Sequence, residues 1–208
     1  MLIAEQLMLL CVDPQRGDFN GLRSHADVNM LSAAALILDL REQRRLRYQG
    51  RHIVIEDLLP TTHPQLAGAA QILAGPVNGL PAIAAIELLV ARLNPISRHL
   101  MESLFRRDVL HRVRESWWPW SKLFFPLRSI QARNDASLQL QHAAAAQSTS
   151  LRGMGLMMLI ELAGQLELNL SGDAHEAAEA KLQHLADQRS ALDADQQLLF
   201  DLREALIN

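Results

Sequence analysis

The chain has 208 residues, of which 49% are hydrophobic, 4% aromatic and 21% charged, and its net charge is −3. This size and balance fit one core or two small ones, and they exclude a disordered or collagen-like chain and a generally basic nucleic-acid binder. Leu and Ala dominate the apolar residues. Because both are strong helix formers, the composition predicts a mostly α-helical fold.

Periodicity and breaks predict about nine helices in one domain that spans residues 1–208. Asp13-Pro14 ends the first helix, and Pro95 suits the first position of a later one. No Pro-, Ser- or charge-rich linker divides the chain. The expected helices are Ala4–Val12, Asp27–Gln43, Pro64–Leu73, Pro81–Leu93, Pro95–Arg107, Arg128–Gln147, Leu151–Leu168, Ala174–Gln188 and Ala194–Ile207.

Two stretches between these helices predict β-hairpins. In Arg45–Glu56, apolar residues alternate with charged ones before a turn at Gly50, and a β-branched run follows. His111–Leu127 carries Pro119 at its centre and Pro126 at its exit. The expected fold class is therefore mostly α, a single globular helical domain with two β-hairpins.

Two further features bear on where the protein works. Cys11 is the only cysteine and lies in an apolar run, so we expect a buried structural thiol rather than a disulfide or a multi-Cys metal site. The longest apolar stretches, Met30–Leu38 and Met154–Ile160, are shorter than the roughly 20 residues of a membrane span. Met1–Val12 lacks the basic start and cleavage site of a signal peptide. We expect a cytoplasmic protein.

The second hairpin contains the most informative residues. All three tryptophans fall within four positions around Pro119, so they cannot all lie on one face of a strand. Indole rings favour the boundary between lipid and water. We predict membrane insertion of the hairpin aromatics, with a protein interface or core burial as open alternatives for the tryptophans and core packing as an alternative for the two phenylalanines. The aromatics are Trp117, Trp118, Trp120, Phe124 and Phe125.

The charge distribution supports a membrane partner. Between residues 98 and 133, eight Lys/Arg stand against three acids, whereas from residue 161 to the end ten acids stand against three bases. A basic residue near an anionic membrane contributes roughly 1 kcal/mol to binding. The side chains predicted to contact anionic headgroups are Arg98, Arg106, Arg107, Arg112, Arg114, Lys122 and Arg128.

No pattern of catalytic or metal-binding residues stands out. The chain has no Gly-rich phosphate loop and no Gly-x-Ser-x-Gly motif, and Glu179 stands where a zinc protease motif beginning at His175 would need its second histidine. Gly153 and Gly155 predict close helix packing. We expect no enzyme, no cofactor and no metal.

Several segments resemble the Golgi phosphoprotein 3 family. Met1–Asp13 is similar to its first helix, Leu36–Tyr48 to its core helix and following strand, and Leu58–Pro64 to a loop of the family. Leu104–Leu110, followed by the aromatic hairpin and Phe125–Leu127, is similar to its basic helix and hydrophobic hairpin. The resemblance implies a single helical domain that binds phosphatidylinositol 4-phosphate on Golgi membranes, inserts its hairpin into lipid and self-associates. Eukaryotic members sort glycosyltransferases through coat proteins.

The family's headgroup pocket uses a Trp in the first loop, an Arg early in the second helix and two Arg before the second hairpin. These positions fall here on Phe19, on Ser32–Ala33, and on Asn94 and Ser97, with Arg98 close by. We therefore predict a bacterial-type relative that binds a general anionic phospholipid surface rather than phosphatidylinositol 4-phosphate. Its expected partners are that membrane, a second copy through residues 111–127, and a client protein.

One alternative from another class is a winged-helix nucleic-acid-binding unit made of Pro95–Leu127, with Arg106, Arg107, Arg112 and Arg114 on phosphates. The Trp-rich tip and the acidic remainder argue against it, so we expect no nucleic-acid partner. An oligomerising scaffold whose hairpin is a protein interface is the other alternative.

Overall fold

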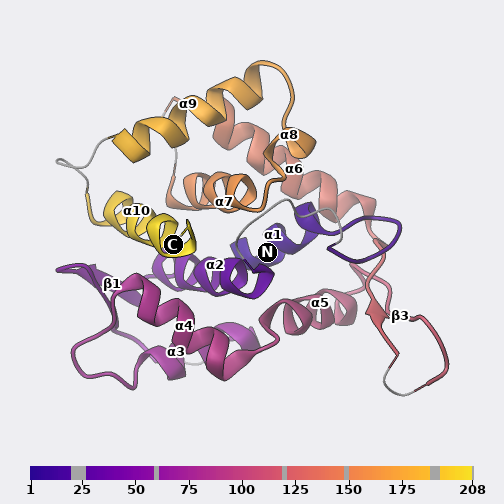
Figure 1. The fold of residues 1–208 in the computed structure, drawn as a ribbon, viewed down its shortest axis with the longest axis horizontal. Coiled ribbons are helices and arrows are strands. Elements are labelled where there is room, and N and C mark those ends of the chain that lie inside the picture. Colours follow the sequence, from indigo (N-terminus) through magenta and orange to yellow (C-terminus); the bar gives the residue numbers. More distant parts are fainter. Residues whose placement is uncertain (20–26, 59–60, 119–120, 148–149, 188–192, 208) are drawn as a thin grey trace.

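The computed structural model describes residues 1–19, 27–58, 61–118, 121–147, 150–187 and 193–207, and within them it has ten helices and two antiparallel strand pairs (Figure 1). This confirms the mostly α-helical fold with two hairpins. The strands are β1 (Leu46–Gln49), β2 (His52–Ile55), β3 (Val113–Arg114) and β4 (Leu123–Phe124). The helices are α1 (Ile3–Cys11), α2 (Val28–Glu42), α3 (Pro64–Leu73), α4 (Ala82–Leu93), α5 (Ile96–Arg106), α6 (Ile130–Ala145), α7 (Leu151–Leu162), α8 (Leu166–Asn169), α9 (Asp173–Asp187) and α10 (Ala194–Ile207).

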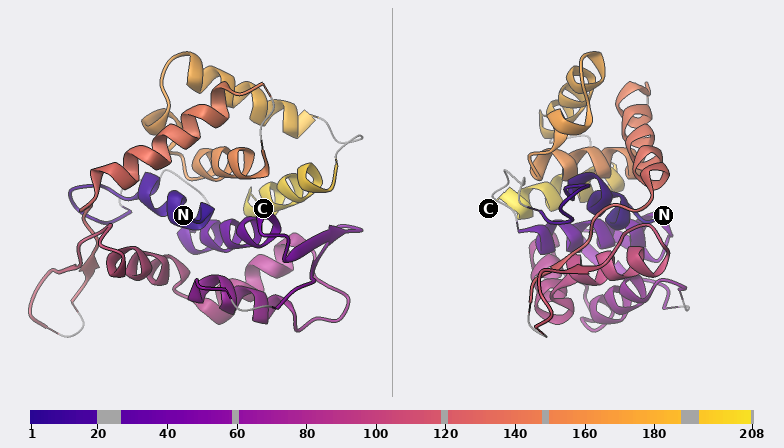
Figure 2. Two further views of the ribbon diagram at one scale, coloured as in Figure 1. Left: turned by 180° about the vertical axis from the view of Figure 1, so that it is seen from behind. Right: turned by 90° about the vertical axis from the view of Figure 1, so that its right-hand side faces the viewer.

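Helix α2 lies at the centre of three layers. In Figures 1 and 2, α1, α2 and α7 form a middle layer, with α6, α8 and α9 on one side and α3, α4 and α5 on the other. Every residue from Leu31 to Leu40 is buried, because α2 packs against α1, α3, α4, α5 and α7. A helix that is apolar on all sides belongs in a core, as its sequence predicts.

Most helices begin and end within two residues of the expected positions, and two differences have a clear physical cause. The single helix expected over Leu151–Leu168 is broken in two, because Gly164 adopts φ +67° and ends α7 with the left-handed residue typical of helix C-termini. The short α8 that follows brings the total in the described ranges to ten instead of about nine. Pro95 is the extended N-cap of α5, and Ile96 is the first helical residue.

Two sequence-based expectations about the interior are confirmed. Gly155 permits close packing of α7 on α2, since a Cβ there would lie 2.6 Å from Leu38 Cδ1. Cys11 is buried, and burial raises the pKa of its thiol to about 12, so it packs as a small apolar side chain.

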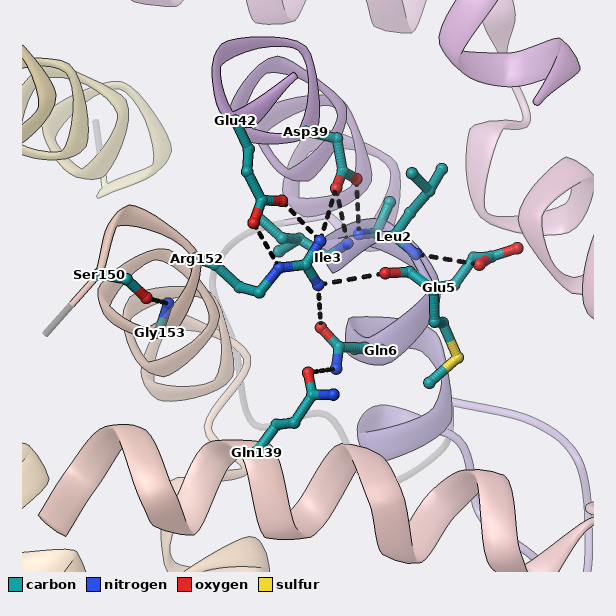
Figure 3. A network of polar contacts seen from close by, with 12 residues as sticks. Leu2, Ile3, Glu5, Gln6, Asp39, Glu42, Gln139, Ser150, Arg152 and Gly153 are labelled. Carbon is teal, nitrogen blue, oxygen red and sulfur yellow. Dashed lines mark hydrogen bonds and ion pairs between the residues drawn. The ribbon is translucent and has the colours of Figure 1, made fainter. Parts of the chain in front are cut away.

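A polar network holds the start of α1 inside the core (Figure 3). The carboxylate of Asp39 in α2 accepts hydrogen bonds from the backbone amides of Ile3 (2.7 Å) and Ala4 (3.0 Å). Arg152 from α7 completes the network by donating to Glu42 (2.6 Å) and to Gln6 (2.8 Å). Burial raises the pKa of Asp39 to about 7, although the two backbone amides act in the opposite direction.

We expect Asp39→Ala to lower the free energy of unfolding by roughly 2–4 kcal/mol, because two buried amides would lose their acceptor and Arg152 would lose the carboxylate that lies 4.0 Å from it. Urea denaturation measures this loss. Asp195→Ala is the matched control, since Asp195 also pairs with an arginine (Arg41, 2.6 Å) but is 42% exposed. Its cost should stay within about 1 kcal/mol. Equal losses in the two variants would contradict the assignment.

Candidate functional site

The second predicted hairpin is present and projects beyond α5 at one corner of the molecule (Figures 1 and 2). Val113 pairs with Phe124 and Arg114 with Leu123. The arms continue on both sides of these pairs, since Leu110 forms a bridge with Leu127 and the amide of Glu115 donates to Lys122 O (3.1 Å). The tip that follows carries two of the three tryptophans within the described residues.

Trp117 and Trp118 are exposed to solvent at this tip. Trp117 is 82% exposed and Trp118 51% exposed, and their rings stack with centroids 4.7 Å apart. Core burial, one of the three alternatives for these rings, is therefore excluded for both residues. Trp120 lies outside the described residues. A pair of large exposed rings at a projecting tip is typical of an interaction surface.

The two phenylalanines of the hairpin lie on opposite faces of their arm, as successive residues of a strand do. Phe124 is half-buried beneath Lys122, whose ammonium nitrogen lies 5.1 Å from the ring centroid. Phe125 is only 5% exposed and belongs to the hydrophobic core. The prediction that Phe125 inserts into a membrane is therefore wrong for this conformation, and the alternative of core packing holds.

The loop after α1 is hydrogen-bonded along this hairpin. Gly17 O accepts from the amide of Phe125 (2.8 Å), and Pro14 O accepts from the amide of Leu127 (2.9 Å). Gly17 has φ +75°, and a Cβ there would lie 2.2 Å from the backbone of Phe125 and Pro126. Only glycine allows this approach. The hairpin is thus fixed to the segment that leaves the core helix α1.

A cavity of about 500 Å³, which we call the Phe19 cavity, opens between this loop, α5 and the hairpin. Its walls combine apolar side chains with two cations and one acid. Among the residues that line it are Asp18, Phe19, Arg98, Met101, Lys122 and Phe125. Sequence reasoning placed Arg98 and Lys122 in a headgroup site but did not identify Asp18, because a loop aspartate gives no signal of where its side chain lies.

The seven predicted cations are not equally available to a ligand. Arg107 donates to Glu5 (2.6 Å), Arg128 to Asp108 (2.5 Å) and Arg112 to Glu102 (3.3 Å). Arg114 is exposed on β3. In the described part of the chain, Arg98, Arg106 and Lys122 form no ion pair with a carboxylate.

The partner of Arg107 is a carboxylate in the middle of the protein. Glu5 is fully buried, and it accepts hydrogen bonds from Arg107, from His63 (3.1 Å) and from the amide of Leu2 (3.1 Å). Burial would raise the pKa of Glu5, but these donors outweigh it and hold the pKa at about 2. Arg107 therefore belongs to the interior network rather than to a headgroup site.

Glu5, His63 and Ser103 are residue types of a nucleophilic triad, but their geometry does not suit one. His63 Nε2 contacts both the Glu5 carboxylate (3.1 Å) and Ser103 Oγ (3.3 Å), whereas a triad uses the two ring nitrogens separately. Nδ1 of His63 is buried and has no hydrogen-bond partner among the described residues. Within the same residues, no three His, Cys, Asp or Glu side chains gather as a metal ion would require.

The positions that the resemblance assigns to headgroup-binding arginines carry no charged side chain, and two of them, Ser32 and Ser97, are buried, whereas Asn94 is exposed. Ser32 is fully buried and donates to Val28 O (2.6 Å) within α2. Ser97 is 7% exposed, and its amide and hydroxyl both donate to Asn29 Oδ1 (3.1 and 3.0 Å). These two hydroxyls therefore bond within the protein, and neither supplies a charge to the Phe19 cavity.

The sequence model of the Golgi phosphoprotein 3 family (GPP34) matches residues 3–205, nearly the whole chain. No curated protein sequence matches it. None of the helices in the described ranges combines the length and apolar character needed to cross a membrane.

The neighbouring arginines at the end of α5 should respond differently to substitution. We expect Arg106→Gln to weaken binding to anionic vesicles about fivefold, the loss for one basic residue at such a surface, without changing stability. Arg107→Gln should instead lower the free energy of unfolding by roughly 1–3 kcal/mol, because buried Glu5 loses a charged donor. Vesicle co-sedimentation and urea denaturation separate the two effects.

The loss in Arg107→Gln should also depend on pH. Because the pKa of Glu5 is lowered from 4.5 to about 2 by folding, its contribution to stability is complete above pH 4.5 and disappears as the pH falls toward 2. The difference in stability between wild type and variant should shrink over the same range. A difference that does not change with pH would contradict the role of the ion pair.

We expect Gly17→Ala to separate the first loop from the hairpin and to cost more than roughly 1 kcal/mol of stability. Gly50→Ala is the matched control, since Gly50 also has a positive φ (+57°) but has no atom within 4 Å of an added Cβ. It should cost less, because only backbone strain remains. Thermal unfolding compares the pair, and an equal cost would show that the contact with Phe125 and Pro126 is unimportant.

Proposed function

Since the chain belongs to the Golgi phosphoprotein 3 family, we propose that it is a peripheral membrane-binding protein that docks on anionic bilayers through its second hairpin. The observation that carries this proposal is the exposed, stacked pair of Trp117 and Trp118 on a hairpin that also carries Lys122, a cation without an ion pair among the described residues. Family membership supports an adaptor role in which the docked protein holds a client protein at the membrane.

The two features of the hairpin act together in this proposal. Indole rings enter the boundary between headgroups and acyl chains, where the apolar ring and the N–H group both find suitable surroundings. Arg98, Arg106 and Lys122 then attract anionic headgroups, each by roughly 1 kcal/mol. Neither contribution alone gives stable anchoring, so binding is reversible and requires an anionic surface.

Self-association through the hairpin is a second candidate function, favoured by the same exposed rings. A second copy could cover Trp117 and Trp118 when no membrane is present. Light scattering tests this candidate, since the wild type should form dimers or larger species that a Trp117→Ala/Trp118→Ala variant does not form. A clean monomer at high protein concentration would count against it.

The membrane proposal is tested by co-sedimentation with anionic vesicles and by tryptophan fluorescence. We expect the Trp117→Ala/Trp118→Ala variant to lose about tenfold or more in affinity, because burying one large apolar side chain contributes roughly 1.5–3 kcal/mol. Leu168→Ala is the control, since Leu168 is 76% exposed but lies on α8. Equally weak sedimentation of wild type and tryptophan variant would refute membrane docking. Salt-sensitive DNA binding would favour the winged-helix alternative.

A further inference from the structure

Ser121 forms two hydrogen bonds across the tip of the second hairpin. Its hydroxyl donates to Ser116 O (2.8 Å), and its backbone amide donates to Trp118 O (3.0 Å). The first of these carbonyls directly precedes Trp117, and the second belongs to Trp118 itself. A single residue on the returning side of the hairpin therefore holds the backbone at both ends of the tryptophan pair.

The arrangement of the two rings needs such a support. The rings of Trp117 and Trp118 stack with their planes 27° apart, although both side chains are exposed, so burial among core side chains does not hold them together. Neighbouring residues of a strand point to opposite faces, which keeps adjacent rings apart. The backbone of the pair instead bends away from a strand. The hydrogen bonds from Ser121 fix the two ends of this bend.

We infer that Ser121 is a positioning residue, which holds Trp117 and Trp118 stacked before they meet a membrane. This inference rests on the proposed membrane docking. Binding orders the side chains of an interface, and the lost freedom opposes binding unless the free protein already holds those side chains in place. With the pair held by Ser121, two large apolar rings enter the lipid as one unit. Ser121 acts through the backbone of the pair and needs no contact with lipid.

Substitution of Ser121 can remove the side-chain half of this support alone. Ser121→Ala keeps the amide that bonds to Trp118 O but loses the hydroxyl that bonds to Ser116 O, so the backbone before Trp117 is released. Ser121→Thr retains a hydroxyl and should behave as the wild type. Ser171→Ala is the matched control, because Ser171 is also a serine outside the core but lies between α8 and α9.

Circular dichroism of the full chain without lipid tests the positioning itself. Two indole rings stacked at a fixed angle give an exciton couplet, whose amplitude falls when the rings move independently. We expect Ser121→Ala to lose most of the couplet, and Ser121→Thr and Ser171→Ala to keep it. Thermal unfolding of each variant should give the wild-type midpoint, since the tip lies outside the core. A couplet that persists in Ser121→Ala would overturn the inference.

Co-sedimentation with vesicles of phosphatidylglycerol and phosphatidylcholine tests the consequence for docking. Ser121→Ala should bind about fivefold more weakly than wild type, because both rings must then be ordered on binding. Ser121→Thr and Ser171→Ala should bind as wild type. Wild-type affinity in a Ser121→Ala protein that has lost its couplet would overturn the inference and leave membrane docking intact. If the wild type binds no vesicle, docking is refuted, whereas the couplet still decides whether Ser121 orders the pair.

A double substitution shows whether Ser121 acts through the tryptophans. When Ser121→Ala is added to the Trp117→Ala/Trp118→Ala variant, affinity for the same vesicles should not fall further, because the residue has no pair left to position. An additional fivefold loss in this background would mean that the Ser121 hydroxyl contributes to binding in another way, and it would overturn the positioning role.

Discussion

Complete burial of α1 is the constraint on which the rest of the structure depends. All nine of its residues are buried, so its free backbone amides and its one acidic side chain cannot be solvated and must find partners inside the protein. Asp39 from α2 accepts from the first amides, and Arg107 and His63 donate to Glu5. Helices from two layers are thereby held to α1 by charge as well as by packing.

The same helix positions the candidate membrane surface. The loop that leaves α1 forms backbone hydrogen bonds with the second hairpin through Pro14 and Gly17, and Phe125 anchors the hairpin in the core. The exposed Trp117 and Trp118 therefore project from a fixed support. This division suits reversible docking, because a rigid base keeps the cations of α5 and the hairpin in place while the tip enters lipid.

The sequence predicts helices better than it predicts sites, and the reasons are physical. Apolar periodicity and proline positions predict the α3 boundaries as the structure has them, because these signals are local.

The sequence does not predict the break at Gly164, because a glycine after an apolar run is compatible with either a continuing helix or a C-terminal cap. The sequence predicts lipid contact for Phe125 because aromatic composition alone does not tell which residues of a short hairpin arm meet the core. The Glu5–Arg107 pair joins residues far apart in sequence, so no spacing could indicate it, although a glutamate in a mostly apolar helix is a signal that a buried partner exists.

Membership of the family indicates the fold of this chain more firmly than it indicates the ligand that the chain binds. At Ser32 and Ser97 the interior is closed by neutral hydrogen bonds, so a headgroup charge there would find no counter-charge. Arg98, Arg106 and Lys122 lie nearer the surface, on α5 and the hairpin. Solvent weakens each of their interactions there, which favours attraction to a charged membrane plane over tight binding of one headgroup. The ten acids after residue 160 lie largely on α9 and α10, away from the hairpin corner in Figures 1 and 2. In the proposed docking, an anionic membrane would repel that side and attract the hairpin side, so the charge distribution would orient the molecule before any tryptophan reached the lipid.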